Sequence, residues 1–181
     1  MRIVAGVFKG RTLKSPTWDG LRPTSDRLRE TLFNILGPSV RGTRVLDGYA
    51  GTGAIGIEAL SRGAAHVTFV EQDPRAAALI EANLAVLDPD GAYGRAIIRA
   101  GFAAAAVRLA GGPFDLIIVD PPYGHDAAEM ALTAADTLAG PSTRVVVEHA
   151  KRHAAPAAAG SLRLRRTVTA GDSALSFYEP A

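Results

Sequence analysis

From residue 43 onward, short apolar runs alternate with longer stretches of helical composition. The runs are rich in β-branched residues and are bounded by glycine, proline or polar residues, which is typical of buried parallel strands. They predict strands at 44–47, 67–70, 96–98, 114–119 and 145–147. The stretches between and after them predict helices at 55–62, 74–87, 103–110 and 127–138. This alternation predicts right-handed crossovers and an α/β fold with a doubly wound, mostly parallel, Rossmann-like sheet.

The two ends of the chain follow other patterns. Residues 1–20 predict a small β-hairpin and a loop that form a mobile basic appendage. A helix is predicted over 24–36, with Thr24 or Ser25 as its N-cap. At the other end, a low-complexity loop is expected at 154–160. Apolar and polar residues then alternate in two segments, which predict an antiparallel strand pair at the edge of the sheet. The two segments are 162–169 and 174–178.

Length and composition limit the class of protein. A chain of 181 residues with 48% hydrophobic and 21% charged residues suits one globular domain, with 43–181 as its core. No apolar run reaches the roughly 20 residues needed to cross a bilayer, and the start of the chain does not resemble a signal peptide. Cysteine is absent and the histidines have no ligand spacing. We therefore expect a cytoplasmic monomer without a metal site or a membrane partner.

Charge is unevenly distributed. Residues 1–44 hold nine Lys and Arg against three Asp and Glu, residues 45–143 hold five against twelve, and residues 144–181 hold six against three. A basic front predicts contact with a polyanion, although a solvated face is an alternative. The candidates for phosphate contact are Lys9, Arg11, Lys14, Arg22 and Arg27. The arginines at the start of the helix have a second interpretation, as ion-pair partners of Asp26 and Glu30.

The sequence Asp120-Pro121-Pro122-Tyr123 follows the predicted strand 114–119 directly. It is therefore expected at the carboxyl end of a central strand, where open α/β sheets bind ligands. Two prolines stiffen the backbone. They have no N–H groups, so this segment offers carbonyl acceptors without the matching donors. A carboxylate and a carbonyl can accept both N–H groups of a planar amine while the tyrosine ring stacks on the base. The alternative is a rigid turn with a locally packed tyrosine.

A glycine-rich loop, Asp47-Gly48-Tyr49-Ala50-Gly51-Thr52-Gly53, joins the first predicted strand to its helix. Ala50, Gly51, Thr52 and Gly53 would let a ligand approach the backbone, and the following helix start offers N–H groups to a carboxylate. Asp47 would accept from an ammonium group, and Glu71, at the end of the second strand, from ribose hydroxyls.

S-Adenosylmethionine carries all three of these groups. The spacing of Gly51, Gly53 and Gly56 also matches a dinucleotide fingerprint. An acid at position 47 would repel pyrophosphate, however, and the chain leaves no room for a separate substrate domain. The predicted strand order places strand one beside strand four, so that Asp47 and Asp120 would flank one site.

These motifs resemble the class I amino-methyltransferases and, more narrowly, the bacterial 16S ribosomal RNA guanine-N2 methyltransferases of the RsmD family. The most specific similarity is in the N-terminal segments 2–6, 10–13 and 21–34, and the shared core motifs lie within 46–64, 71–73 and 115–123. The resemblance implies methylation of the N2 of a guanine in 16S ribosomal RNA, alone or in a small-subunit assembly intermediate. It also implies catalytic roles for Asp120, Pro121, Pro122 and Tyr123. After the third strand the chain lacks the acid that many relatives place near the adenine, so Phe102 is a candidate contact there.

Three other functions remain open at this stage. A DNA amino-methyltransferase acting on adenine N6 or cytosine N4 would share both motifs, but it usually needs a separate target-recognition region. A protein glutamine methyltransferase is disfavoured by the basic N-terminal segment. A non-catalytic RNA-binding module with a vestigial cofactor pocket is disfavoured because Asp47, Glu71 and Asp120 are all present.

Overall fold

A single mixed sheet organises the chain. The computed structural model describes residues 1–21, 24–112, 114–122, 124 and 126–181. Within this part of the chain the sheet has eight strands in the order β3-β2-β1-β4-β5-β8-β7-β6. Its parallel strands are β1 (Arg44–Gly48), β2 (His66–Val70), β3 (Gly94–Ile98), β4 (Phe114–Val119) and β5 (Ala139–Ala150). This arrangement confirms the predicted doubly wound α/β fold.

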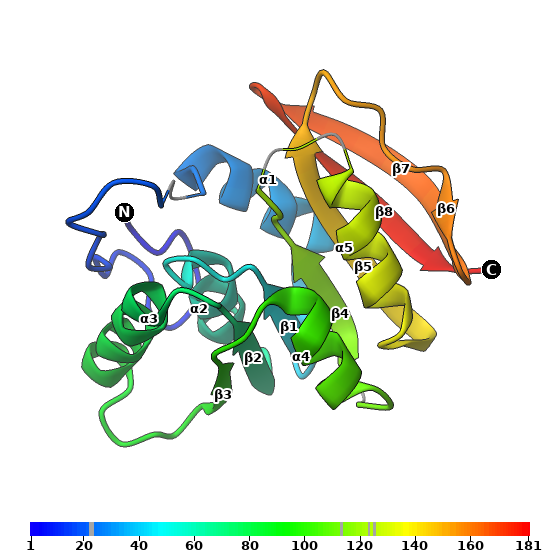
Figure 1. The fold of residues 1–181 in the computed structure, drawn as a ribbon. Coiled ribbons are helices and arrows are strands. Elements are labelled where there is room, and N and C mark those ends of the chain that lie inside the picture. The colour runs from blue at the N-terminus through cyan, green and yellow to red at the C-terminus, as the bar shows by residue number, and fades with distance from the viewer. Residues whose placement is uncertain (22–23, 113, 123, 125) are drawn as a thin grey trace.

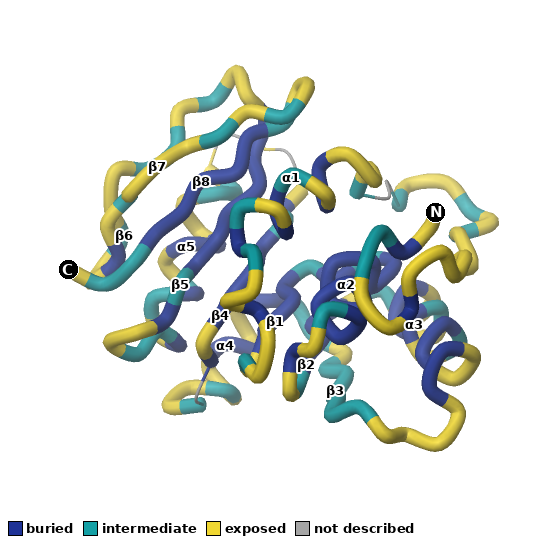
Figure 2. The backbone as a smooth tube through the Cα atoms, turned by 180° about the vertical axis from the view of Figure 1, so that it is seen from behind, coloured by how far each residue is buried: buried dark blue, intermediate teal, exposed yellow. Residues whose placement is uncertain are grey.

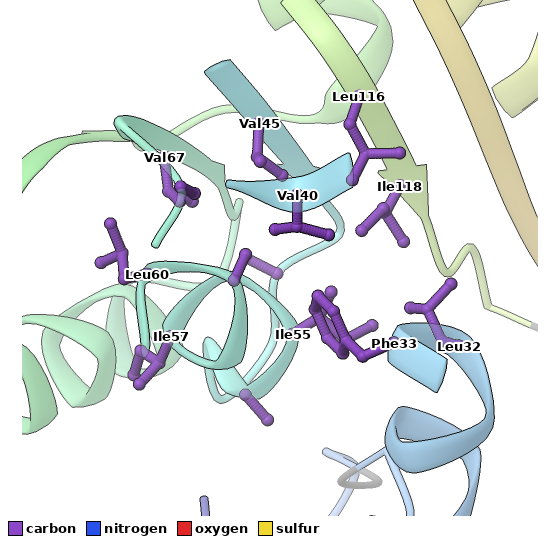
Figure 3. Packing of buried hydrophobic residues seen from close by; sticks show 14 of the residues in the cluster. Leu32, Phe33, Val40, Val45, Ile55, Ile57, Leu60, Val67, Leu116 and Ile118 are labelled. Carbon is purple, nitrogen blue, oxygen red and sulfur yellow. The ribbon is translucent and has the colours of Figure 1, made fainter. Parts of the chain in front are cut away.

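Helices cover both faces of the sheet (Figure 1). One face carries α1 (Asp26–Leu36), the short 3₁₀ helix η1 (Gly37–Val40), α2 (Ala54–Ser61) and α3 (Pro74–Leu87). The other carries α4 (Phe102–Leu109) and α5 (Ala127–Asp136). Successive strand residues point to opposite faces, so Leu116 and Ile118 of β4 join the first core while Ile117 and Val119 join the second. Figure 3 shows side chains from α1, α2 and three strands meeting in the first core.

The antiparallel edge is also confirmed. β8 (Ser173–Pro180) pairs with β5, and β7 (Leu162–Ala170) pairs with β8. Part of the segment expected to be a loop forms a two-residue strand, β6 (Ala158–Ala159), on the outside of β7. Figure 2 shows the consequence for burial, since β5 and β8 run through the interior while β7 is largely exposed.

Helix α1 begins and ends where its capping residues predict. The Ser25 Oγ accepts the Leu28 N–H at 3.1 Å, and Gly37 adopts a positive φ of 55° at the C-cap. Arg29 is fully buried, and its guanidinium donates to the Arg2 carbonyl at 2.8 Å. It also pairs with Asp26 and lies 3.6 Å from a Glu58 oxygen. Arg29 therefore pairs with carboxylates, as one of the two interpretations predicted. One partner is the expected Asp26, and the other is Glu58 instead of Glu30.

The N-terminal segment is docked on the domain, contrary to the expectation of a mobile appendage. The Glu58 carboxylate accepts the N–H groups of Val4 and Ala5 at 2.8 and 3.0 Å. The hairpin is reduced to a single antiparallel bridge between Arg2 and Thr12. The apolar side chains of the segment are buried against the helices, and they are Ile3, Phe8 and Leu13. These side chains stabilise the docked position because apolar area leaves water.

Candidate active site

A pocket of about 520 Å³ lies where the central parallel strands end, a size that suits a small-molecule ligand. Its wall combines the loop after β1, the ends of β2 and β4, a buried side chain of β5, and the chain before and at the start of α1. Its lining residues include Trp18, Thr24, Tyr49, Ala50, Gly51, Thr52, Glu71, Asp120, Pro121, Pro122 and Glu148. The register pairs Gly48 of β1 with Val119 of β4, which brings the two predicted motifs to one site.

The loop after β1 forms one side of the pocket. Tyr49 has a φ of 62°, the only positive φ of a residue other than glycine in the part of the chain that the structure describes. Such backbone strain concentrates at functional sites. Gly51 also has a positive φ, and its N–H donates to the Glu71 Oε2 at 2.7 Å. Ala50, Gly51 and Thr52 lie on the pocket wall, and their contact with a cofactor remains a prediction.

Glu71 is positioned by its own hydrogen bonds. Its Oε1 accepts the Asp73 N–H at 2.8 Å, so both carboxylate oxygens are held by backbone donors. Each oxygen keeps further acceptor capacity, because a carboxylate oxygen has two lone pairs. The side chain is buried yet lines the pocket, which leaves it able to accept a ligand hydroxyl.

Asp47 and Gly53 lie beneath the pocket wall. Asp47 is 1% exposed, and its Oδ2 accepts the Gly56 N–H at 2.8 Å. Its side chain therefore holds the start of α2, whereas the sequence predicted a direct contact with the ligand. Burial raises the pKa of Asp47 to about 8, the Gly56 N–H opposes this rise, and the charge of Glu71 adds to it. Gly53 is the N-cap of α2 with a φ of 75°, and it faces Ile80.

Replacing Asp47 with asparagine should change how stability depends on pH. Between the ordinary pKa of 3.8 and the folded value of about 8, the folded protein holds a proton that the unfolded chain has lost. The stability of the wild type should therefore fall, relative to Asp47→Asn, as the pH rises through this window, by up to about 1.4 kcal/mol per pH unit. Asparagine keeps an acceptor for Gly56. Urea unfolding of both proteins from pH 5 to 8 measures the difference, and parallel curves would contradict it.

Phe102 is in the core and not on the pocket wall, so the expected adenine contact is not supported by its position. It is 3% exposed, and its ring lies 5.3 Å from that of Tyr49. A Cβ at Gly48 would come within 2.7 Å of the Phe102 ring. Phe102 thus fills the space left by that glycine and supports Tyr49 from below.

Asp120 follows β4 directly and lies beside residues of three other parts of the chain. Its N–H donates to the Gly48 carbonyl at 3.3 Å, and the Thr24 hydroxyl donates to its Oδ2 at 3.3 Å. Glu148 of the neighbouring strand β5 lines the same pocket, close enough for its charge to act on Asp120. Burial, followed by the charge and hydrogen bond of Glu148, raises the pKa of Asp120 well above its usual range, against a smaller opposing effect of Thr24.

The rest of this motif is partly described. Pro121 and Pro122 line the pocket beside Asp120. Tyr123 lies outside the described residues, so its stacking role remains a prediction.

Three residues of the pocket were not recognised from the sequence. Thr24 was interpreted only as a helix cap, although it lies in the most family-specific stretch. Trp18 is the single tryptophan of the chain, and the Arg75 guanidinium lies over its ring at 5.2 Å from the ring centroid. Glu148 follows an apolar strand segment just as Asp120 does, which is the pattern that could have revealed it.

Four of the five predicted RNA-binding residues lie outside the pocket. Lys9, Arg11, Lys14 and Arg27 are exposed, and the Arg11 guanidinium donates to the Val86 carbonyl at 3.1 Å. Arg22 lies outside the described residues. Across the described chain there is no group of three or more metal-binding side chains. Nor does any helix in that part of the chain have the length and hydrophobicity needed to cross a membrane.

Comparisons with known proteins agree with this architecture. The model of a family described as "Conserved hypothetical protein 95" matches residues 1–179. The chain is 36% identical to "Putative rRNA methyltransferase YlbH" of Bacillus subtilis, over 99% of this chain and 98% of that protein. It is 34% identical to "Ribosomal RNA small subunit methyltransferase D" of Escherichia coli, over 99% and 89%. A solved structure, "Putative methyltransferase yhhF from Escherichia coli", superimposes with a TM-score of 0.85 at 34% identity, covering 99% of this chain and 97% of the other.

Proposed function

The chain belongs to the family described as Conserved hypothetical protein 95, and we propose that it is an S-adenosylmethionine-dependent methyltransferase acting on the N2 amino group of a guanine in 16S ribosomal RNA. The observation that carries the proposal is that one pocket wall contains both the loop around Gly51 and the carboxyl group of Asp120. The relatives whose names state an activity on ribosomal RNA support the choice of substrate.

The pocket residues fit the cofactor by their chemistry. When bound, S-adenosylmethionine supplies a methyl group carried on a positively charged sulfonium. Glu71 offers acceptor oxygens to ribose hydroxyls, and the loop at 50–52 allows close approach of the ligand to the backbone. Asp47 acts indirectly, since it fixes the start of α2 beneath this loop.

Asp120 and Pro121 would prepare the guanine amine for transfer. The amine is a weak nucleophile because its lone pair is delocalised into the ring. A carboxyl oxygen of Asp120 and the Pro121 carbonyl would accept its two N–H groups, favour a pyramidal nitrogen and stabilise the positive charge that develops there. The nitrogen becomes acidic once methylated, so the proton can leave late and Asp120 need not be a strong base. Tyr123 would stack on the base, which must leave its RNA stack to enter.

The exposed basic residues of the N-terminal region would contact RNA phosphates. Replacing Lys9, Lys14 and Arg27 together with alanine should weaken RNA binding at low salt. It should also make the slope of log K against log salt less steep by about 2, since each lost phosphate contact removes roughly 0.7 from the slope for a single strand. Filter binding at several salt concentrations measures this. Arg108→Ala, an exposed arginine on α4, is the control, and an unchanged slope in the triple variant would contradict the assignment.

Transfer of labelled methyl groups separates the proposal from its rivals. Purified protein is incubated with S-adenosylmethionine labelled in the methyl group and with small-subunit ribosomal RNA, duplex DNA or a protein extract. Label in the RNA alone supports the proposal. Label in DNA would favour a DNA amino-methyltransferase, and label in protein would favour a protein methyltransferase. Cofactor binding without transfer to any acceptor would favour a non-catalytic RNA-binding module.

A further inference from the structure

A second carboxyl group lies against Asp120 in the pocket. Glu148 belongs to β5 and is 5% exposed. The register pairs Val119 of β4 with Val147 of β5, so Asp120 and Glu148 occupy the next positions on neighbouring strands. Parallel strands lie about 4.8 Å apart, which brings the two side chains within hydrogen-bonding reach. Both carboxyl groups line the same pocket.

Asp120 and Glu148 lie close enough for their charges to interact. Burial and the charge of Glu148 raise the pKa of Asp120. The Thr24 hydroxyl donates to the Asp120 Oδ2 at 3.3 Å. Each carboxyl oxygen has two lone pairs, so both groups keep acceptor capacity beside these contacts. The pair therefore presents two adjacent acceptors to a ligand in the pocket.

We propose that Glu148 determines specificity for guanine by accepting the N1–H of the target base while Asp120 accepts from its N2 amino group. This inference depends on the function proposed above, and it assigns to Glu148 a role that neither sequence motif supplies. N1 and N2 of guanine are bonded to the same ring carbon, so their N–H groups point in nearly the same direction. Two neighbouring carboxyl oxygens match this pair of donors.

The other amino-bearing bases present a different edge. Adenine carries its amino group beside the N1 lone pair, and cytosine carries its amino group beside the N3 lone pair. In either case an acceptor of the base would face an acceptor oxygen of Glu148. A site built to hydrogen-bond a substrate N–H rejects analogues that lack it by roughly 10⁴-fold, because its buried polar group is left unpaired. Glu148 thus supplies discrimination that Asp120 and Pro121, which contact only the amino group, cannot.

The test uses an RNA in which the target guanine is replaced by 2-aminopurine. This base keeps the N2 amino group but has a lone pair at N1. The wild type should methylate guanine RNA and discriminate strongly against 2-aminopurine RNA. Glu148→Gln should lose roughly 10- to 100-fold in kcat/KM on guanine, as expected for a lost charged acceptor. Its activity on 2-aminopurine should be retained or raised, because the glutamine amide can donate to N1. The ratio between the two substrates should therefore fall at least tenfold, and Glu148→Ala should shift it in the same direction.

Three controls make each outcome decisive. Calorimetry checks that S-adenosylmethionine still binds, thermal unfolding checks that the variants fold, and Glu81→Gln, an exposed glutamate on α3, should leave the ratio unchanged. Equal losses on both substrates would mean that Glu148 only supports the pocket, and would overturn this inference while leaving the proposed function intact. If the wild type transfers no methyl group to guanine RNA, the proposed function fails and this inference fails with it.

Discussion

Replacing Asp120 with alanine is expected to lower the rate of methyl transfer by roughly 10³-fold, the cost of removing a positioned group that stabilises developing charge. The carboxyl group accepts the Thr24 hydroxyl and lies beside Glu148 at the pocket wall. Its loss leaves one N–H group of the amine without an acceptor and the developing positive charge without a counter-charge. Single-turnover transfer of labelled methyl groups to ribosomal RNA measures the effect.

Cofactor binding should survive the same substitution. The loop at 50–52 is hydrogen-bonded to Glu71 and does not depend on Asp120 for its position. Calorimetry should therefore give a Kd for S-adenosylmethionine within about threefold of the wild type, a difference in binding free energy of about 0.65 kcal/mol. Asp115→Asn is the matched control, because this exposed residue of the same strand lies outside the pocket and accepts the Arg44 N–H. Transfer that persists in Asp120→Ala would refute the role assigned to Asp120.

Replacing Glu58 with alanine should destabilise the protein by about 3–5 kcal/mol, the usual result of breaking a buried ion pair and leaving its partner uncompensated. Glu58 is fully buried and lies 3.6 Å from Arg29, which is also fully buried. It also accepts two N–H groups of the N-terminal segment and pairs with Arg62 at 2.7 Å. Chemical unfolding measures the loss of stability.

A local readout distinguishes this effect from general weakening. The amide hydrogens of Val4 and Ala5 should exchange faster in Glu58→Ala, because their acceptor is gone. Glu81→Ala breaks an exposed pair with Arg99 and should cost less than about 1 kcal/mol. Equal stability losses in the two variants would contradict the importance assigned to the buried network.

Much of the fold could be predicted because local signals agreed with one another. Helix α3 begins at Pro74 and ends at Leu87 as predicted, since proline at the first helical position and the turn after Leu87 define both ends. The position of β1 beside β4 followed from the strand order typical of the doubly wound fold that the alternation predicts. The Asp120 motif could be located for the same reason, because it follows a buried central strand.

The remaining features depend on side-chain burial, which the sequence pattern does not specify. Asp47 and Phe102 lie at the expected ends of their elements, but they point beneath the pocket wall. The N-terminal segment has the composition of a solvated arm, yet it is docked through Glu58, a residue some fifty positions away. Glu148 becomes significant only when the register brings it beside Asp120.

The identity of the methylated atom is the most direct test of the central claim. Small-subunit RNA from cells lacking this protein is incubated with the purified protein and S-adenosylmethionine, then digested to nucleosides and analysed by mass spectrometry. We expect N2-methylguanosine to appear at one position with the wild type and to be absent with Asp120→Ala. Methyl groups on adenine or cytosine, or none on any nucleoside, would contradict the assignment of the pocket to a guanine amine.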